Sequence, residues 1–386
     1  MSLLTRKRAI LAKIETTYGV DASPTGGANA ILMSNLTVSP MEMTLVERAN
    51  IKAYLGNNPS VLAAIYAKLA FDVEMAGSGT AGTVPAYGVL LRACGLSETI
   101  LATAVTGTAT AGSLTSITLA APASSVDGAY NGMTIALTGG SASPATAVIA
   151  SYVGATKVAT FTTPLAVAAD VTTVYSIGAQ VVYQPISTSF ESVTVTCVVD
   201  TVVHKLLGAR GTVQVKMTAQ GIPMFSFTLS GLYVDVADGT TPAVTLSAFK
   251  APLAVNNRNT TGLVVAGFAG AVGSDMSFDF GNNVVFRSLV GGSETVIITD
   301  RKVSGSITAE ATTVAAQNWW LNIKNVLLGP FSVTQGTVAG NKVKIDAPNV
   351  QLTTPAYADK DGITMLTTKA DMIPVNGNDE ITLCFL

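Results

Sequence analysis

The sequence predicts a mainly β protein with two similar β-sandwich or barrel modules, each with a flanking α-helix, and one inserted β-sandwich. Val, Thr, Ala, Ser and Gly dominate the composition, which favours strands joined by tight turns. The strand-like segment Lys68–Met75 precedes a short helix expected at Val84–Cys94. A similar segment, Lys302–Ala309, precedes one expected near Thr313–Lys324. Residues 102–179 interrupt the first module with a different composition.

A second pair of segments supports a divergent duplication. Thr212–Val215, followed by Gly221–Phe225, matches Asn349–Leu352 followed by Gly362–Leu366. A chain with two similar β-rich modules can build a symmetric ring from half as many chains as a protein with one module.

Composition limits the classes of function. The 386 residues can hold two to three domains, each with its own core. Charged residues are 12 %, against about 25 % in typical soluble proteins. A chain with so few charged residues is expected to have much of its surface covered by other copies of itself. The net charge of −2 gives no basic footprint for nucleic acid. No run of about 18 apolar residues is present, so no membrane partner is expected.

No catalytic or metal site is expected. Cys94, Cys197 and Cys384 are far apart and odd in number, which predicts reduced, buried thiols of a cytoplasmically made protein. His204, the only histidine, has no nucleophile motif beside it and is expected to be structural. The sequence therefore predicts neither an enzyme nor a cofactor.

The first part of the chain predicts an N-terminal arm and a first module. Residues 1–30 form the arm. The first module, called module one, comprises residues 31–101 and 180–237. Its expected elements are a strand at Ile31–Val38, a polar loop at Glu47–Ser60, a strand at Val61–Met75, and a helix with Pro85 in its first turn and Gly95 at its stop.

Residues 102–179, called the insert, have Asp127, Lys157 and Asp170 as their only charges. Turn signals such as Asn131-Gly132 separate short alternating segments, a pattern typical of a small β-sandwich. The strands expected there are Ser116–Leu119, Met133–Leu137, Ala147–Tyr152, Val158–Phe161 and Val171–Ile177. Module two has no counterpart, so we expect an outward-facing accessory domain. Residues 238–259 are a linker, and residues 260–386 are module two.

The predicted strands have one apolar and one polar face, because alternate side chains point to opposite sides of a sheet. In module one, Asp72 and Glu74 alternate with Phe71, Val73 and Met75. The residues expected on the polar faces are Asp72, Glu74, Gln214, Lys216, Ser226, Thr228, Thr308, Glu310, Gln351, Thr353, Thr367, Lys369 and Asp371. Asp72 and Glu74 also form a carboxylate pair, but the same spacing arises on any solvated strand face.

Gly77-Ser-Gly-Thr-Ala-Gly82 matches the G-x-G-x-x-G pattern of dinucleotide sites between a predicted strand and a predicted helix. The alternating strands around it differ from the continuous apolar strands of a parallel sheet. The matching segment Glu310–Val314 contains no glycine. We therefore expect a flexible turn, and a nucleotide-binding enzyme is the distant alternative. Trp319-Trp320 is expected to anchor the second helix to its sheet, with base stacking as a minor alternative.

Several segments resemble the major tail tube protein of long-tailed, siphovirus-type bacteriophages. The resemblance covers both modules and rests on Lys13–Pro24, Gly79–Gly95, Phe190–Val195, Gly208–Gly211, Leu289–Glu294, Thr299–Lys302 and Asn376–Glu380. Within the insert, Tyr130–Met133 and Lys157–Thr160 resemble small β-domains that recur as appendages of phage structural proteins.

The resemblance implies a duplicated tail-tube fold whose sheets join between subunits into one barrel. Rings of such subunits stack helically into a hollow tube through which the genome leaves the capsid. Many relatives form rings of six single modules, so three of these chains would form a pseudo-sixfold, homotrimeric ring. The polar-face residues become candidates for the lumen wall, and DNA would pass without specific binding. Loops Glu47–Ser60 and Phe286–Ser293 and the arm are candidate ring-to-ring contacts.

The implied partners are other copies of the chain and the tape measure, terminator and distal tail proteins. The implied location is the virion tail, after assembly in the host cytoplasm. A tail terminator or distal ring protein of the same fold is the alternative, because it would cap a tube without polymerising.

Overall fold

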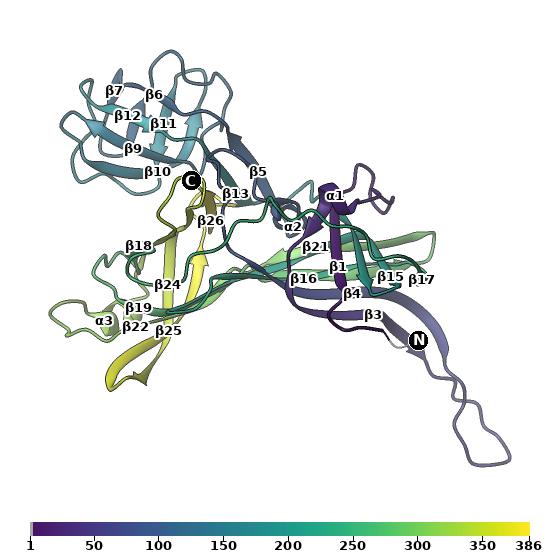
Figure 1. Ribbon diagram of the computed structural model, residues 1–386. Coiled ribbons are helices and arrows are strands. Elements are labelled where there is room, and N and C mark those ends of the chain that lie inside the picture. Colours follow the sequence, from purple (N-terminus) through teal and green to yellow (C-terminus); the bar gives the residue numbers. More distant parts are fainter. Residues whose placement is uncertain (1–2) are drawn as a thin grey trace.

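A computed structural model describes residues 3–386, and within them the protein is mainly β, as predicted. The helices there are short: α1 (Gly26–Asn29), α2 (Gly88–Ala93) and α3 (Trp319–Lys324). Figure 1 shows module one and module two side by side, with the insert as a separate body beyond them and a long hairpin extending from the opposite end. No described helix has both the length and the apolar character needed to cross a membrane.

One run of eight antiparallel strands crosses both modules in the order β3-β4-β16-β15-β19-β22-β25-β24. Module one supplies the first four strands and module two supplies the other four. The strands are β3 (Ser34–Val46), β4 (Val61–Glu74), β16 (Met224–Tyr233), β15 (Val202–Thr218), β19 (Gly273–Asp279), β22 (Ser304–Glu310), β25 (Ile363–Ile373) and β24 (Val343–Lys360).

Further strands extend this sheet around the core. They are β1 (Arg8–Ile14), β2 (Ala30–Ile31), β5 (Leu96–Leu101), β13 (Gln180–Pro185), β14 (Val193–Val199), β17 (Ala237–Asp238), β18 (Thr260–Val264), β23 (Leu328–Gln335) and β26 (Thr382–Phe385). Part of the predicted N-terminal arm, residues 8–14, forms β1 of this sheet. β1 pairs with β14 along its whole length, because its apolar run is buried and Ile10 has no exposed surface. Residues 1–2 lie outside the described part.

The two modules share one hydrophobic core, which corrects the expectation of a separate core for each. Phe225 and Phe227 of β16 and Phe278 of β19 belong to the same buried cluster as Phe331 of β23. Alternation of buried and more exposed residues along Met224–Leu229 of β16 and along all of β19 places these rings on one side of the sheet. The division of the chain into modules stays a prediction.

The insert contains a seven-stranded sheet with its own core. All the strands expected there are present, one with the predicted ends, Val158–Phe161, and the others with shifted ends, while two short strands were not predicted. The order in the sheet is β6 (Val105–Thr108), β12 (Val174–Ile177), β9 (Thr134–Gly139), β10 (Ala145–Val153), β11 (Val158–Phe161), β8 (Ser116–Thr118) and β7 (Ala111–Gly112).

The insert is joined firmly to the rest of the chain. The β5–β13 pair, which ends at Leu101 and Gln180, leads directly into the β6–β12 pair. The fully buried Gln180 carboxamide bonds both backbone groups of Thr134 at 3.0 Å and accepts from the Cys384 thiol. A buried side chain with all its partners in place holds the insert in one orientation.

Both module helices begin later than predicted. In module one, residues 84–85 are irregular and residues 86–87 form a turn, where the buried Tyr87 donates its hydroxyl proton to Ala76 O at 2.6 Å. In module two, the Asn318 side chain accepts from Leu321 N at 2.9 Å and so caps α3 there.

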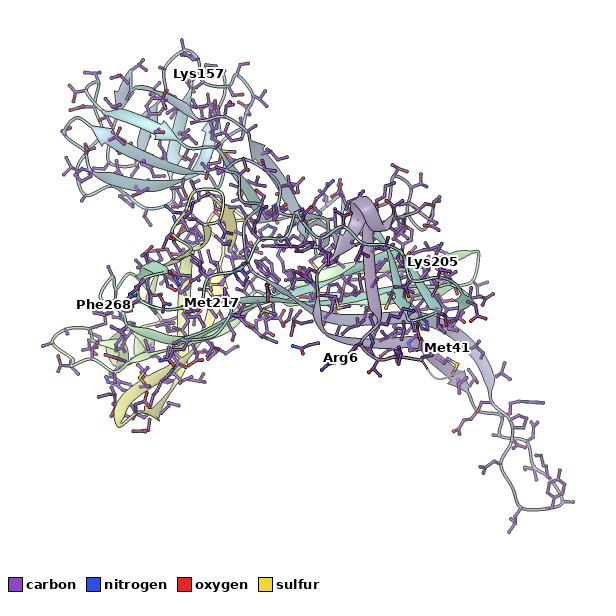
Figure 2. The ribbon with its side chains drawn as sticks, viewed as in Figure 1. Arg6, Met41, Lys157, Lys205, Met217 and Phe268 are labelled. Carbon is purple, nitrogen blue, oxygen red and sulfur yellow. The ribbon has the colours of Figure 1, made fainter. Side chains whose placement is uncertain are left out.

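Two hairpins project from equivalent strand pairs. The module-one hairpin, residues 40–67, continues β3 and β4 past their sheet to a loop at residues 47–60, as predicted (Figures 1 and 2). The module-two hairpin, residues 280–303, contains β20 (Asn282–Leu289) and β21 (Ser293–Arg301). The loop expected at Phe286–Ser293 is therefore shorter, and only residues 290–292 form the turn.

Candidate functional site: a polar sheet face and a module junction

The strand registers bring all the predicted polar-face residues onto one continuous face of the eight-stranded run. Directly paired residues of antiparallel strands point to the same side of a sheet. Asp72 faces Ser226, which faces Gln214. The same row continues across module two in the order Asp279, Ser304, Asp371 and Gln351.

The neighbouring rows hold the other candidates. One row contains Lys216, Lys369 and Thr353, and the next contains Thr308 and Thr367, whose hydroxyls lie 2.9 Å apart. Thr228 lies beside Ala70, while Glu74 and Glu310 lie opposite Met224 and Met365 respectively. Pairing places these side chains on one face; that this face lines a lumen stays a prediction.

The prediction missed the contribution of β19 to this face. Asp275, Ser277 and Asp279 point to the same side as Lys216, and Ser306 of β22 joins them. The signal was present in the sequence, because Asp275-Met-Ser-Phe-Asp279 alternates polar and apolar residues with a period of two. The carboxylates of β19 make the central part of the face more acidic than expected.

Acidic groups outnumber lysines on this face, and some are already paired. Asp371 lies 3.1 Å from the Lys369 ammonium, and Asp275 lies 3.9 Å from Lys360. Asp72 accepts from the Asn35 amide at 2.8 Å. A hollow bordered by Asp72, Gln214, Lys216 and Asp279 lies where the two modules meet. Short polar groups with excess negative charge offer little attraction to phosphate.

The two modules join edge to edge through β15 and β19. Residues Gln214–Thr218 pair with Asp275–Asp279 without a register shift. The registers also correct the internal alignment by two residues. Met224 faces Glu74, and the equivalent Met365 faces Glu310, so Glu74 corresponds to Glu310 rather than to Thr308. The carboxylate at that position is therefore present in both modules.

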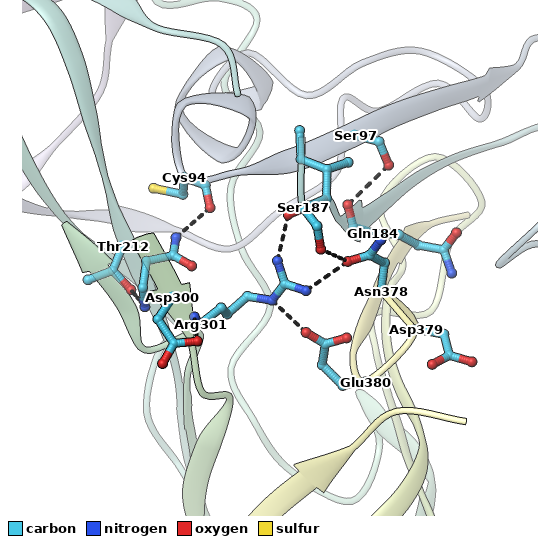
Figure 3. A network of polar contacts seen from close by, with 12 residues as sticks. Cys94, Ser97, Gln184, Ser187, Thr212, Asp300, Arg301, Asn378, Asp379 and Glu380 are labelled. Atoms are coloured by element: carbon cyan, nitrogen blue, oxygen red, sulfur yellow. Dashed lines mark hydrogen bonds and ion pairs between the residues drawn. The ribbon is translucent and has the colours of Figure 1, made fainter. Parts of the chain in front are cut away.

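Arg301, the last residue of β21, connects two loops, one from each module, as Figure 3 shows. Its guanidinium contacts Glu380 at 2.5 Å, Asn378 at 3.0 Å and the carbonyl of Ile186 at 2.7 Å. Asn378 also accepts from the Ser187 hydroxyl at 2.6 Å. The side chains of Arg301 and Glu380 are only 12 % and 8 % exposed, so removing one would leave the other as an unpaired buried group.

Other arginines tie further loops to the junction. Arg210 donates to the carbonyl of Phe190 at 2.6 Å and to that of Val296 at 2.8 Å. Arg92 forms a two-pronged ion pair with Glu191 at 2.6 Å, and this partner raises the Arg92 pKa. The family-like segments Gly79–Gly95, Phe190–Val195 and Gly208–Gly211 therefore contact one another through these arginines.

The buried Glu15 carboxylate organises the turn after β1. It accepts hydrogen bonds from the backbone N–H groups of Gly19 and Gly208 and from the hydroxyls of Ser192 and Thr194. Four donors on a single carboxylate explain why a charged residue is only 8 % exposed there. Its role is to fix the backbone.

The glycine-rich loop packs closely against the backbone of residues 340–341. Gly79 N donates to Gly340 O at 2.9 Å, and Gly77 N donates to the Asn341 side chain at 2.8 Å. A Cβ atom on Gly77 would lie 2.1 Å from Gly340 O. Glycine is needed at position 77 because two backbones touch there, and the N–H groups of Gly77 and Gly79 are already used in this contact.

The remaining sequence candidates have structural environments. His204 lies in β15 opposite Cys197, and burial lowers its pKa. All three cysteines are free and buried, as predicted; burial raises the pKa of Cys197 to about 11 and that of Cys384 to about 12. Among residues 3–386, no cluster of His, Cys, Asp and Glu could hold a metal ion.

The two tryptophans divide their roles. Trp319 is buried against Phe268 and donates its indole proton to Thr312 at 2.9 Å, so it anchors α3 as predicted. Trp320 is 39 % exposed and contacts the ring of Tyr357, which is itself 66 % exposed.

Comparison with protein families identifies the lineage. The family model described as "Phage tail tube protein" matches residues 5–382. The chain belongs to this family. A search of curated proteins found no match. As a tail tube protein the chain is a structural component of the phage tail, and its family is one of self-assembling proteins that join other tail proteins.

Proposed function

We propose that this protein polymerises as stacked rings into the hollow, non-contractile tail tube of a siphovirus-type phage, and that the tube conducts the genome into the host. The observation that carries the proposal is the pairing of β15 with β19, which joins two modules edge to edge inside one chain. The same kind of contact, repeated between chains, generates a ring.

The two ends of the eight-stranded run are suited to this repeat. Within the described chain, β3 pairs only with β4, and β24 has no second partner strand beyond Gln351. Open strand edges are templates for further pairing. By analogy with β15 and β19, residues 356–360 of one chain pair with residues 34–39 of the next. Three chains then supply six modules and leave no open edge.

Burial supports the same edge. Tyr357 corresponds in the β24–β25 hairpin to Val215 in the β15–β16 hairpin. Val215 is fully buried at the junction inside the chain, whereas Tyr357 is 66 % exposed. An exposed aromatic ring at the position of a core residue is expected if a second copy covers it.

In this ring the polar face is the lumen wall. Its carboxylates repel the DNA backbone, and its serine and threonine hydroxyls keep the channel wet without holding phosphates. Rings stack through the tips of the two hairpins, residues 47–60 and 290–292. Tape measure, terminator and distal tail proteins are the further partners, and assembly takes place in the host cytoplasm.

Electron microscopy of the purified protein tests the proposal. We expect tubes whose reconstruction has three chains per ring, with Asp72 and Glu74 at the channel surface. Single rings that never elongate would favour a terminator or distal ring protein of the same fold. Six chains per ring would contradict the trimeric ring but not the tube function. A protein that stays monomeric at all concentrations would contradict assembly itself.

A further inference from the structure

The two projecting hairpins occupy equivalent places in the repeat. The module-one hairpin connects β3 to β4, and the module-two hairpin connects β19 to β22. Through the corrected alignment Ala67 corresponds to Val303, and both are 3 % exposed. Counting back from this pair along each strand, Leu62 corresponds to Ile298.

The module-two hairpin lies across module one at the end of α2. Asn282 donates to the carbonyls of Cys94 and Gly211 at 2.6 and 2.9 Å. Val296 is fully buried, and Ile298 is 8 % exposed. Ile298 contacts the turn after α2, where a Cβ on Gly95 would lie 3.3 Å from its Cδ1 atom. This hairpin therefore covers the neighbouring module inside the chain.

Apart from Tyr66, whose ring stacks on Phe286 near the base, the module-one hairpin covers nothing within the described residues. It runs away from the body in Figure 1, and its apolar residues are open to solvent. Leu62 is 50 % exposed, and its neighbours Met41, Met43, Leu45, Val46 and Val61 are 43–54 % exposed. Apolar side chains in this number on a projecting hairpin indicate a surface that another molecule covers.

A matching apolar surface lies at the end of α3. Val326 lies two residues after the end of α3, just as Gly95 lies two residues after the end of α2. Both have positive φ, +53° and +76° respectively. Gly95 is buried under Ile298, whereas Val326 and Leu327 are 55 % and 50 % exposed. Leu328, the first residue of β23, is 47 % exposed.

We propose that the module-one hairpin of one chain lies over the end of α3 in a second copy within the same ring. Leu62 takes the place of Ile298, and Val326–Leu328 take the place of the turn after α2. This inference rests on the proposed ring and adds a second contact to the β24–β3 edge. The hairpin and the edge of β3 belong to the same two strands, so both reach the same neighbour.

Cross-linking on assembled tubes tests the contact. The double variant Leu62→Cys/Val326→Cys is treated with a short bis-maleimide and dissolved in SDS. The native cysteines are buried and react slowly. We expect covalent dimers and trimers and nothing larger, because a ring of three closes on itself. The matched control, Leu62→Cys/Val126→Cys, carries its second thiol on the insert and should remain monomeric.

The possible outcomes distinguish failure of the hairpin contact from failure of the proposed ring. Tubes that form without cross-links would overturn the hairpin contact and leave the proposed function intact. Ladders longer than three chains would show that the hairpin reaches another ring and would also overturn it. Failure of the unmodified protein to form rings would remove both proposals together.

A charge in the covered surface provides a second measurement. Leu327→Asp places a carboxylate where the second copy must exclude water, so the critical concentration for assembly should rise about tenfold or more. The melting temperature of the unassembled chain should stay the same, because Leu327 is exposed there. The control Val126→Asp should change neither quantity. An unchanged critical concentration for Leu327→Asp would contradict the inference.

Discussion

Arg301 directs its guanidinium to three acceptors on two different loops, residues 186–187 and 378–380. Neither loop belongs to a regular element, so their mutual position depends on this side chain. Such contacts join residues more than 70 positions apart, and strand alternation carries no information about them. The sequence marked Thr299–Lys302 and Asn376–Glu380 as family-like, but it could not predict that they meet.

Loss of Arg301 should therefore destabilise the chain strongly. We expect Arg301→Ala to lower the free energy of unfolding by about 3–5 kcal/mol, because Glu380 is left buried without its partner. The double variant Arg301→Met/Glu380→Gln removes both charges, so its free energy of unfolding should fall by less than that of Arg301→Ala. Urea unfolding of the two proteins measures the difference. Equal losses would mean that the unpaired carboxylate is not the cause.

The close approach of another backbone segment, rather than a chemical role, restricts position 77 to glycine. Gly77→Ala should lower the free energy of unfolding by about 1–3 kcal/mol, since the new methyl group meets the Gly340 carbonyl. Gly27→Ala is the matched control, because a Cβ there meets nothing within 4 Å. Thermal unfolding compares them. Equal melting temperatures would show that the loop can move aside.

At the scale of elements, period-two alternation located most strands but could not fix the register of the repeat. A shift of two residues keeps every side chain on its own face, so alternation fits the wrong alignment as well as the right one. Only the pairing of Glu74 and Glu310 with equivalent methionines resolves it. Helix starts were missed for a different reason, because Tyr87 and Asn318 act through specific hydrogen bonds.

The insert should be removable. Leu101 and Gln180 are directly paired, so a short Gly/Ser linker in place of residues 103–178 can close the β5–β13 hairpin. We expect the shortened chain to form the same tubes with a lower melting temperature, because Val182 and Cys384 lose part of their cover. Electron microscopy and thermal unfolding check both points. Insoluble protein, or absence of rings, would assign the insert to the core assembly.

At the scale of the whole molecule, the polar face could be predicted from alternation, apart from β19. Its continuity across two modules could not, because it depends on the pairing of β15 with β19. The double variant Asp72→Lys/Glu74→Lys should still assemble, since both side chains are only partly buried. DNA ejection should be slower, and added salt should reduce the difference, because the new contacts are with phosphates.

Two controls accompany the ejection assay. Val126→Lys/Val153→Lys places two lysines on exposed positions of the insert and should leave the ejection rate unchanged. A reconstruction of the tube locates the substituted positions. If Asp72 and Glu74 lie on the outer surface, the assignment of the lumen face is wrong.

The single core that crosses both modules has a calorimetric consequence. Phe225, Phe227, Phe278 and Phe331 share one buried cluster, so neither module can lose its packing while the other keeps it. The heat-absorption peak of these residues should have equal calorimetric and van't Hoff enthalpies, the mark of all-or-none melting. The insert, whose core cluster includes only Val182 and Cys384 from the rest of the chain, should contribute its own peak. A duplicated sequence would thus melt as one unit, beside a smaller domain that melts independently.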